Sequence, residues 1–299
     1  GDPILFHDSD RFSPVIYNNM KGRILNVSIF SDGNADERIE FDVELDKVIN
    51  GMDVIDGEFE LLEHDIYEET NNFQTSNRHA AARLKEVLNS KIPNHIVCIP
   101  YSFRSVSHDN EHAQIFWKHY IAKYGKRILE VTDTDKDFFD ASFTRFYMDS
   151  KDKSFVHDYV EKMKLLWKNR DVYIVEGTGT CFGVNDDFLD GARTIHRIIC
   201  PATNAFDKYE QIIEVCKKNI PQKALVLCAL GMTATILAYD LAKEGYQAID
   251  IGHADVEYVW FKMGVEHKVP IAGKNVNEVG VNDESSDNQD YLNEIIFRI

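Results

Sequence analysis

The stretch "ALVLCALGMTATILAYDLAKEGYQAIDIG", residues 224–252, decides the fold class. An apolar run, 224–231, leads into a stretch of helical character, 232–245, and then into a second apolar run, 246–252. Runs that are apolar throughout are typical of strands buried on both faces of a parallel sheet. Because parallel strands are joined by right-handed helical crossovers, this stretch predicts one β-α-β unit of a doubly wound sheet.

The same alternation continues through most of the chain. We expect further strands at 95–100, 127–133, 171–177 and 197–202, and helices at 110–125, 154–169, 185–196 and 205–219. Together these segments predict a Rossmann-like, doubly wound α/β domain with a mostly parallel sheet flanked by helices.

The two ends of the chain differ from this pattern. The first 45 residues include "SDGNADER" (31–38) and show little periodicity, so we expect an N-terminal extension or small hairpin layer at 1–45. A single domain then spans 46–299. Near its end, the solvated acidic loop "NDESSDNQD" (282–290) precedes a final apolar "YLNEIIF" (291–297).

Charge and cysteine content limit the partners. The 299 residues contain 33 Lys and Arg against 50 Asp and Glu, a net charge of -17, which argues against nucleic acid or anionic lipid as a general partner. No apolar run approaches the ~20 residues that span a bilayer. Five cysteines without a CxxC pair predict reduced thiols, and we therefore expect a soluble protein of cytoplasmic location.

A glycine-rich loop follows one predicted strand, in "VYIVEGTGTCFGVNDDF" (172–188). Gly177, Gly179 and Gly183 would let the backbone approach a phosphate closely, and Asn185 opens an Asn-Asp-Asp run that can cap a helix. The spacing is not the dinucleotide fingerprint, and the next strand ends at Pro201, where a nicotinamide enzyme would need an acid. A plain strand-to-helix turn is an equally good interpretation.

Two further loops follow predicted strands. In "LCALGMTAT" (227–235), Gly231 and Thr233 stand at the start of a helix, where small residues and hydroxyls suit phosphate or ribose oxygens and also suit a simple N-cap. In "AIDIGHADVEYVWF" (248–261), His253, Asp255 and Glu257 alternate. They share one face if the segment is extended, whereas Asp255 becomes the cap if a helix starts there; either way they are candidate bases.

An acidic pair lies nearer the N-terminus, in "VINGMDVIDGEFELL" (48–62). Asp56 and Glu58 flank a glycine that leaves room for a substrate. Carboxylate oxygens suit hard cations such as Mg²⁺ and Mn²⁺, which keep substrate phosphates among their other ligands. Taken alone, the three residues favour a turn or a helix cap.

Taken together, these segments resemble the GT-D-type glycosyltransferases, metal-dependent enzymes that use a nucleotide sugar and build glycans, including those on bacterial serine-rich adhesins. The resemblance covers about residues 45–280. It is carried by "DGEFELL" (56–62), "FTRFYMDSKDKS" (143–154), "YIVEG" (173–177), "GVNDDF" (183–188), "RIICPATNAFDKYEQI" (197–212), "ALGMTATILAYDL" (229–241) and "GYQAIDIGHADVEYVWF" (245–261). It implies that the family's D-x-E metal motif falls on Asp56 and Glu58.

The sequence departs from the family pattern at three places. Asp53, Val54 and Ile55 replace the Arg-Phe-Gly that commonly precedes the D-x-E motif. Cys181 replaces an arginine in the glycine-rich loop, and Val259 replaces the second acid of an E-Y-E-W-F motif. If that acid is the family's general base, this chain must use Asp255, Glu257 or His253, or be inactive.

We therefore expect a glycosyltransferase that moves a hexose from a UDP-sugar to a glycan or glycoprotein acceptor with the help of Mn²⁺ or Mg²⁺. UDP-glucose is the donor that the resemblance implies. A non-catalytic, glycosyltransferase-like binding subunit is the alternative, and a nicotinamide-dependent oxidoreductase is a third hypothesis. The aromatic run "IFWKHYIAKY" (115–124) could serve a homodimer as easily as the core.

Overall fold

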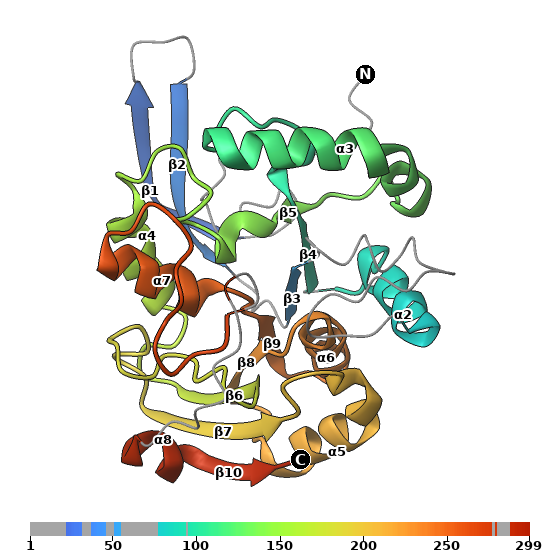
Figure 1. Ribbon diagram of the computed structural model, residues 1–299, viewed down its shortest axis with the longest axis vertical. Coiled ribbons are helices and arrows are strands. Elements are labelled where there is room, and N and C mark those ends of the chain that lie inside the picture. The colour runs from blue at the N-terminus through green and yellow to red at the C-terminus, as the bar shows by residue number, and fades with distance from the viewer. Residues whose placement is uncertain are drawn as a thin grey trace.

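The computed structural model describes residues 22–31, 37–45, 51–54, 77–93, 95–276, 279 and 288–299. Its main feature is an eight-stranded sheet in the order β10-β7-β6-β8-β9-β3-β4-β5, in which every neighbouring pair is parallel (Figure 1). The strands are β3 (Gly51–Val54), β4 (His95–Ile99), β5 (Phe139–Asp140), β6 (Asp171–Gly177), β7 (Thr194–Cys200), β8 (Leu225–Ala229), β9 (Gln247–Asp250) and β10 (Ile295–Arg298).

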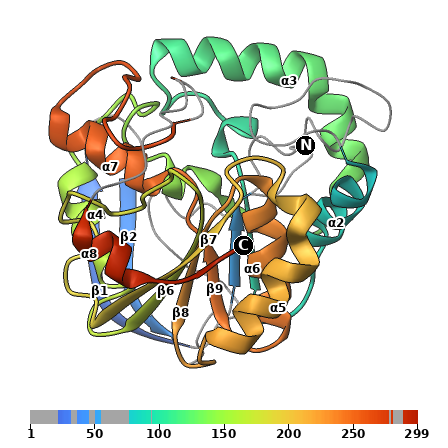
Figure 2. The same ribbon diagram turned by 60° about the horizontal axis from the view of Figure 1, so that its bottom comes forward.

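Helices cover both faces of this sheet. One layer contains α2 (Arg78–Leu88), α3 (Glu111–Val131), α5 (Tyr209–Asn219) and α6 (Met232–Lys243), and the other contains α4 (Val156–Lys164) and α7 (Ala254–Met263). Figure 2 shows α5 and α6 on one side of the strands and α4 and α7 on the other. Each layer has its own apolar core, so the sheet is buried on both faces and the prediction of a doubly wound α/β fold is confirmed.

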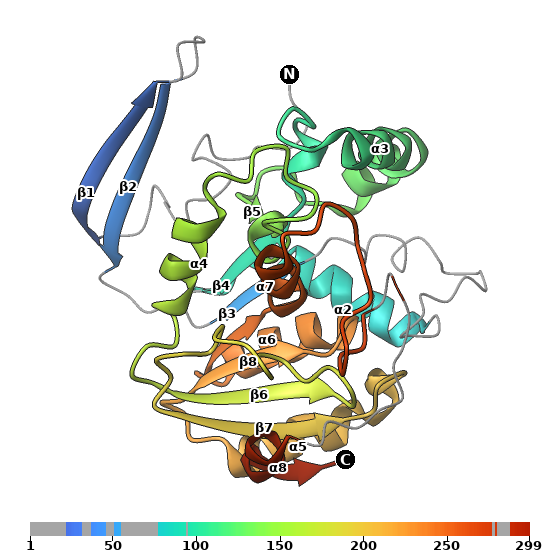
Figure 3. The same cartoon turned by 60° about the vertical axis from the view of Figure 1, so that its left-hand side comes forward.

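The ends of the chain add two smaller parts. Strands β1 (Gly22–Ser31) and β2 (Glu37–Leu45) form an antiparallel hairpin, as one of the two alternatives for the N-terminal region predicted (Figure 3). The final apolar segment forms α8 (Gln289–Glu294) and then β10, which joins the edge of the sheet beside β7. No helix among the described residues is long and apolar enough to cross a membrane.

The strand predicted at 127–133 is wrong, because α3 continues to Val131. Tyr120, Tyr124, Ile128 and Val131 are all buried, at the spacing of one helical face. Burial of this face outweighs the β-branched character of the last turn, since β-propensity is weaker than tertiary packing. The next strand is instead β5, only two residues long.

The helix predicted at 185–196 is also wrong, because the described backbone there is a series of turns leading directly into β7. Asn185 and Gly191 have φ angles of 65° and 89°, which a right-handed helix does not accept. The Asp186 side chain accepts a hydrogen bond from the Phe188 N–H at 2.9 Å. Such local bonds from Asp and Asn favour turns over helix.

For residues 253–263 the helical alternative is correct. Helix α7 begins at Ala254, and His253 rather than Asp255 occupies the N-cap position. The extended alternative, in which His253, Asp255 and Glu257 share one face, is therefore wrong. Gly264, with a φ of 65°, ends the helix in the left-handed conformation that glycine favours.

We predict that His95 limits the stability of the fold in acid. Burial, together with the Lys136 charge, lowers the pKa of this largely buried imidazole from 6.5 to about 3. The unfolded chain therefore binds a proton that the folded chain resists, and stability falls between pH 6.5 and pH 3 by up to about 1.4 kcal/mol per pH unit. Urea unfolding of His95→Gln should show a shallower decline over this range.

His157→Gln is the matched control, because His157 is exposed on α4. It should follow the parent protein at every pH. Equal acid sensitivity in His95→Gln and the parent would contradict this role for His95.

Candidate active site

The carboxyl ends of β6, β8 and β9 lie side by side, and the chain leaves them in different directions. Residues after β8 enter α6 in one helical layer, whereas residues after β6 and β9 pack in the other layer, with Phe182 and Tyr258 in its core. Ligands of open parallel sheets bind where neighbouring connections diverge in this way. Gly177, Gly231 and His253 follow or end these three strands, so the predicted loops meet at one place.

The glycine-rich loop is held by buried charges. The Phe182 N–H donates to Glu176 at 2.8 Å, and the Phe182 carbonyl accepts from Arg197 at 2.9 Å. Glu176 and Arg197 themselves form an ion pair of 2.8 Å that is almost completely buried. The Gly183 N–H donates to Asp255 at 2.8 Å. These bonds hold the loop in one conformation.

Two amides of this loop have no bond to another described residue; Gly179 is partly exposed and can meet a ligand, whereas Cys181 is buried. The N–H groups of Gly179 and Cys181 donate to no other residue in the part of the chain that the structure describes. The amide of Gly183, by contrast, is already bonded to Asp255. Gly179, Cys181 and Gly183 have φ angles of 83°, 49° and 65°, whereas Thr180 and Phe182 between them have negative φ angles. Alternation of left- and right-handed residues turns neighbouring amides toward one side.

The start of α6 contributes a second set of amides. Gly231 is exposed, has a φ of 54° and precedes the first helical residue. The first N–H groups of a helix have no partner within it and favour an anion. Thr233 is buried, and Thr235 donates from its hydroxyl to Asp250 at 2.8 Å. The helix start is thereby tied to the end of β9.

Asp255 is buried and fully engaged. Its carboxylate accepts two hydrogen bonds from Lys274, at 2.6 and 2.8 Å, besides the one from Gly183. Burial raises the pKa of Asp255 to about 6, and the Lys274 charge opposes that rise. These contacts suit a structural anion, because a base needs access to the hydroxyl that it deprotonates.

Glu257 is also buried, and it anchors another loop. One carboxylate oxygen accepts from the N–H groups of Tyr147 and Met148, both at 2.7 Å. The other oxygen has no hydrogen-bond partner among the described residues. Burial raises the pKa of Glu257, although the two amides favour its charged form. The contact joins α7 to the segment after β5.

Of the three candidate bases, His253 is the one with partial solvent exposure. It follows the end of β9 by three residues, at the N-cap position of α7. Asn185 is exposed beyond the glycine-rich loop, and its side chain accepts from Asn288 at 2.9 Å. It therefore contacts the C-terminal segment.

The predicted metal pair, Asp56 and Glu58, lies outside the described residues. Strand β3 ends at Val54, two residues before Asp56, and pairs with β9 and β4. Within the described part of the chain, no group of three or more His, Cys, Asp or Glu side chains could hold a metal ion.

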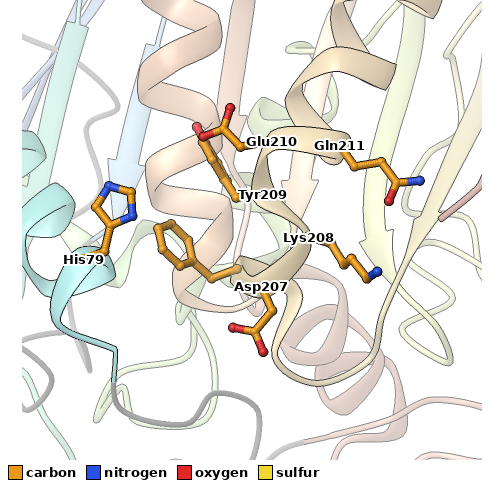
Figure 4. A pocket seen from close by; sticks show the side chains of 7 residues that line it. His79, Asp207, Lys208, Tyr209, Glu210 and Gln211 are labelled. Atoms are coloured by element: carbon orange, nitrogen blue, oxygen red, sulfur yellow. The ribbon is translucent and has the colours of Figure 1, made fainter.

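The structure also contains a pocket of about 340 Å³ between the start of α2 and the start of α5 (Figure 4). Its lining includes none of the predicted site residues. The lining residues are His79, Phe206, Asp207, Lys208, Tyr209, Glu210 and Gln211.

Lys274, Glu176 and Arg197 support the site, and the sequence did not indicate them. Lys274 lies far along the chain from the loop that it supports, in a stretch without helical or strand periodicity. Glu176 and Arg197 lie in strands β6 and β7, and their charge within an apolar run is the only sequence feature that could have indicated a role. A buried charge within a strand needs a partner, and the two strands pair directly.

Comparison with known proteins identifies the family. The family described as "Glycosyltransferase GT-D fold" matches residues 54–279. Two curated relatives are each 36% identical: the probable glycosyl transferase Gly of Streptococcus gordonii over 231 residues, and the glycosyltransferase GlyD of Streptococcus pneumoniae over 206 residues. These matches cover 76% and 68% of this chain but only 33% and 25% of the relatives, so the chain spans about a third or less of their length.

Solved structures agree. One, described as a conserved domain of unknown function 1792 with a distinct glycosyltransferase fold, has a TM-score of 0.77 and 34% identity over 83% of this chain and 89% of its own. Another, described as a new glycosyltransferase from Streptococcus sanguinis, has a TM-score of 0.76 and 32% identity over 83% and 92%. The chain belongs to the GT-D glycosyltransferase family.

We predict that Glu257→Ala destabilises the protein by about 3 kcal/mol, because two buried amides lose their acceptor and a cavity remains. Glu257→Gln should cost less, since its amide oxygen can still accept. Urea unfolding measures both. Glu266→Ala, at an exposed acid after α7, is the control. A Glu257→Ala protein as stable as its parent would show that this anchor has no structural role.

Proposed function

We propose that this chain transfers a hexose from a UDP-sugar to a glycan or glycoprotein acceptor. The observation that carries the proposal is the unengaged amide of the partly exposed Gly179, in a loop that follows β6 beside β8 and the start of α6. The glycine-rich loop and the start of α6 both offer backbone N–H groups at the place where the connections after β6 and β8 diverge. Such N–H groups are suitable donors for the oxygens of a diphosphate. Membership of a glycosyltransferase family makes a sugar nucleotide the favoured diphosphate, in preference to a nicotinamide dinucleotide.

Asp56 and Glu58 would hold Mn²⁺ or Mg²⁺ in this proposal. The donor set supports it, because carboxylate oxygens are the ligands that these cations prefer. The bound cation would neutralise the diphosphate as a leaving group. A chain with a net charge of -17 has particular need of such a cation to bind an anionic donor.

His253 is our proposed residue on the acceptor side. Its partial exposure at the start of α7 gives access to a hydroxyl, whereas Asp255 and Glu257 are buried and bonded to backbone amides. Glucose as the transferred sugar rests on the family resemblance.

We predict that UDP raises the Tm strongly only when Mn²⁺ or Mg²⁺ is present, because in this proposal Asp56 and Glu58 would hold a cation that offsets the charge of the diphosphate. Asp56→Ala and Glu58→Ala should each abolish the metal-dependent part of the thermal shift. Asp158→Ala, at an exposed acid on α4, should keep it. Equal stabilisation by UDP with and without metal would count against the acidic pair.

Donor hydrolysis, with water as acceptor, tests the enzyme against a non-catalytic binding subunit. We expect slow, metal-dependent release of UDP that stops in Asp56→Ala. His253→Ala should reduce the release about 100-fold, the lower range for loss of a general base, and should leave UDP binding unchanged. The exposed His267 provides the control, His267→Ala.

Two results would change the account. Binding of UDP without turnover of any sugar nucleotide would favour the binding subunit. Full hydrolysis by His253→Ala would remove that residue from the mechanism.

A further inference from the structure

Residues 271–276 lie against the glycine-rich loop and are attached to it at two points. We call this segment the strap. We infer that its Asn275 sets the direction of the Gly179 amide and so positions the donor diphosphate, with Lys274 fixing the far end of the loop. The inference rests on the proposed function and adds positioning residues to it.

Asn275 forms the first attachment. Its side-chain amide donates to the Thr178 carbonyl at 3.1 Å, and its backbone N–H donates to the Gly179 carbonyl at 2.8 Å. In a trans peptide the carbonyl and the N–H point in opposite directions. Because Asn275 binds the carbonyl of the peptide between Thr178 and Gly179, the N–H of Gly179 points away from the strap.

The next peptide, between Gly179 and Thr180, is fixed in the same way. Asn275 holds the Gly179 carbonyl, and the Thr180 N–H, on the opposite side of that peptide, donates to the Gly177 carbonyl at 3.0 Å. The Gly179 N–H is thus left without a described partner between two fixed peptides. A donor that is already oriented binds an anion without a further ordering cost.

Lys274 forms the second attachment. Its ammonium group is almost completely buried between Asp255, at 2.6 Å, and Asp186, at 3.3 Å. Asp255 in turn accepts from the Gly183 N–H. The two carboxylates raise the pKa of Lys274 against the effect of burial, so the group stays charged. The strap therefore fixes the start of the loop at Thr178 and Gly179 through Asn275, and its far end at Gly183 through Lys274 and Asp255.

Glycine at position 179 fits this arrangement. A Cβ atom there would lie 2.1 Å from the Asn275 side-chain nitrogen, and the φ of 83° disfavours any other residue. The close contact makes Gly179 and Asn275 a coupled pair.

The test is UDP binding measured by calorimetry in the presence of Mn²⁺. Asn275→Ala should weaken UDP binding about 10-fold, as expected for one misdirected charge-assisted hydrogen bond. In donor hydrolysis, KM should rise by the same factor while kcat stays within about twofold, because the residue positions the donor and does not react. Asn219→Ala is the matched control, since it also removes a side-chain bond to a backbone carbonyl, at 2.8 Å on α5.

A double-mutant cycle adds a readout that general destabilisation would not give. Gly179→Ala alone should weaken UDP binding at least as much as Asn275→Ala, because the new methyl group displaces the Asn275 side chain. In the double variant, the loss of UDP affinity should be smaller than the product of the losses in the two single variants. The reason is that the Asn275 side chain, which the new methyl group would displace, is already absent. Urea unfolding of each variant shows what fraction is folded.

The outcomes separate the two proposals. If the parent protein binds no UDP with Mn²⁺, the proposed function fails, and this inference fails with it. If the parent binds UDP and folded Asn275→Ala binds it equally well, the strap has no positioning role while the proposed function stands.

Discussion

The Asp255 carboxylate connects three segments that are far apart in the sequence: the glycine-rich loop after β6, helix α7 after β9, and the strap at 271–276. Burying a charge of this kind is costly unless it is paired and hydrogen-bonded. Asp255 meets that condition through Lys274 and the Gly183 N–H, and each bond also fixes a neighbouring segment. Glu257, one turn away from the helix start, holds the segment after β5 in the same manner. Rigid loops around the strand ends follow from these two anchors.

This arrangement gives the two acids a different role from the one that their spacing suggests. Asp255 and Glu257 stand near the site, but both are buried: Asp255 accepts from a backbone amide and a buried ammonium group, and one oxygen of Glu257 accepts from two backbone amides. His253 keeps partial exposure. Val259 stands where the family resemblance leads us to expect a second acid, and His253 is the residue that we propose on the acceptor side instead. Val259 is only partly buried in α7 and packs with the apolar layer.

The fold was largely predictable because its strands are apolar throughout and its helices amphipathic. The failures have local causes. "RILEVTD" contains β-branched residues, yet its Ile128 and Val131 continue the buried face of α3. "NDDFLDGARTIH" looks helical, but Asn185 and Gly191 adopt left-handed conformations and the aspartates form turns. The candidate loops were predictable from glycines after strands. Lys274 and Asn275 were not, because their role depends on tertiary contacts that no local pattern records: Lys274 with Asp255 and Asp186, 19 and 88 positions away, and Asn275 with Thr178, 97 positions away.

The central claim is that the diphosphate of a UDP-sugar lies against the Gly179 amide, at the divergence of the loops after β6 and β8. A crystal structure with UDP and Mn²⁺ tests it most directly. We predict a phosphate oxygen within hydrogen-bonding distance of the Gly179 N–H and a cation shared by the diphosphate, Asp56 and Glu58. A diphosphate bound elsewhere, for instance in the pocket beside His79 and Phe206, with Asp56 and Glu58 facing solvent, would contradict it.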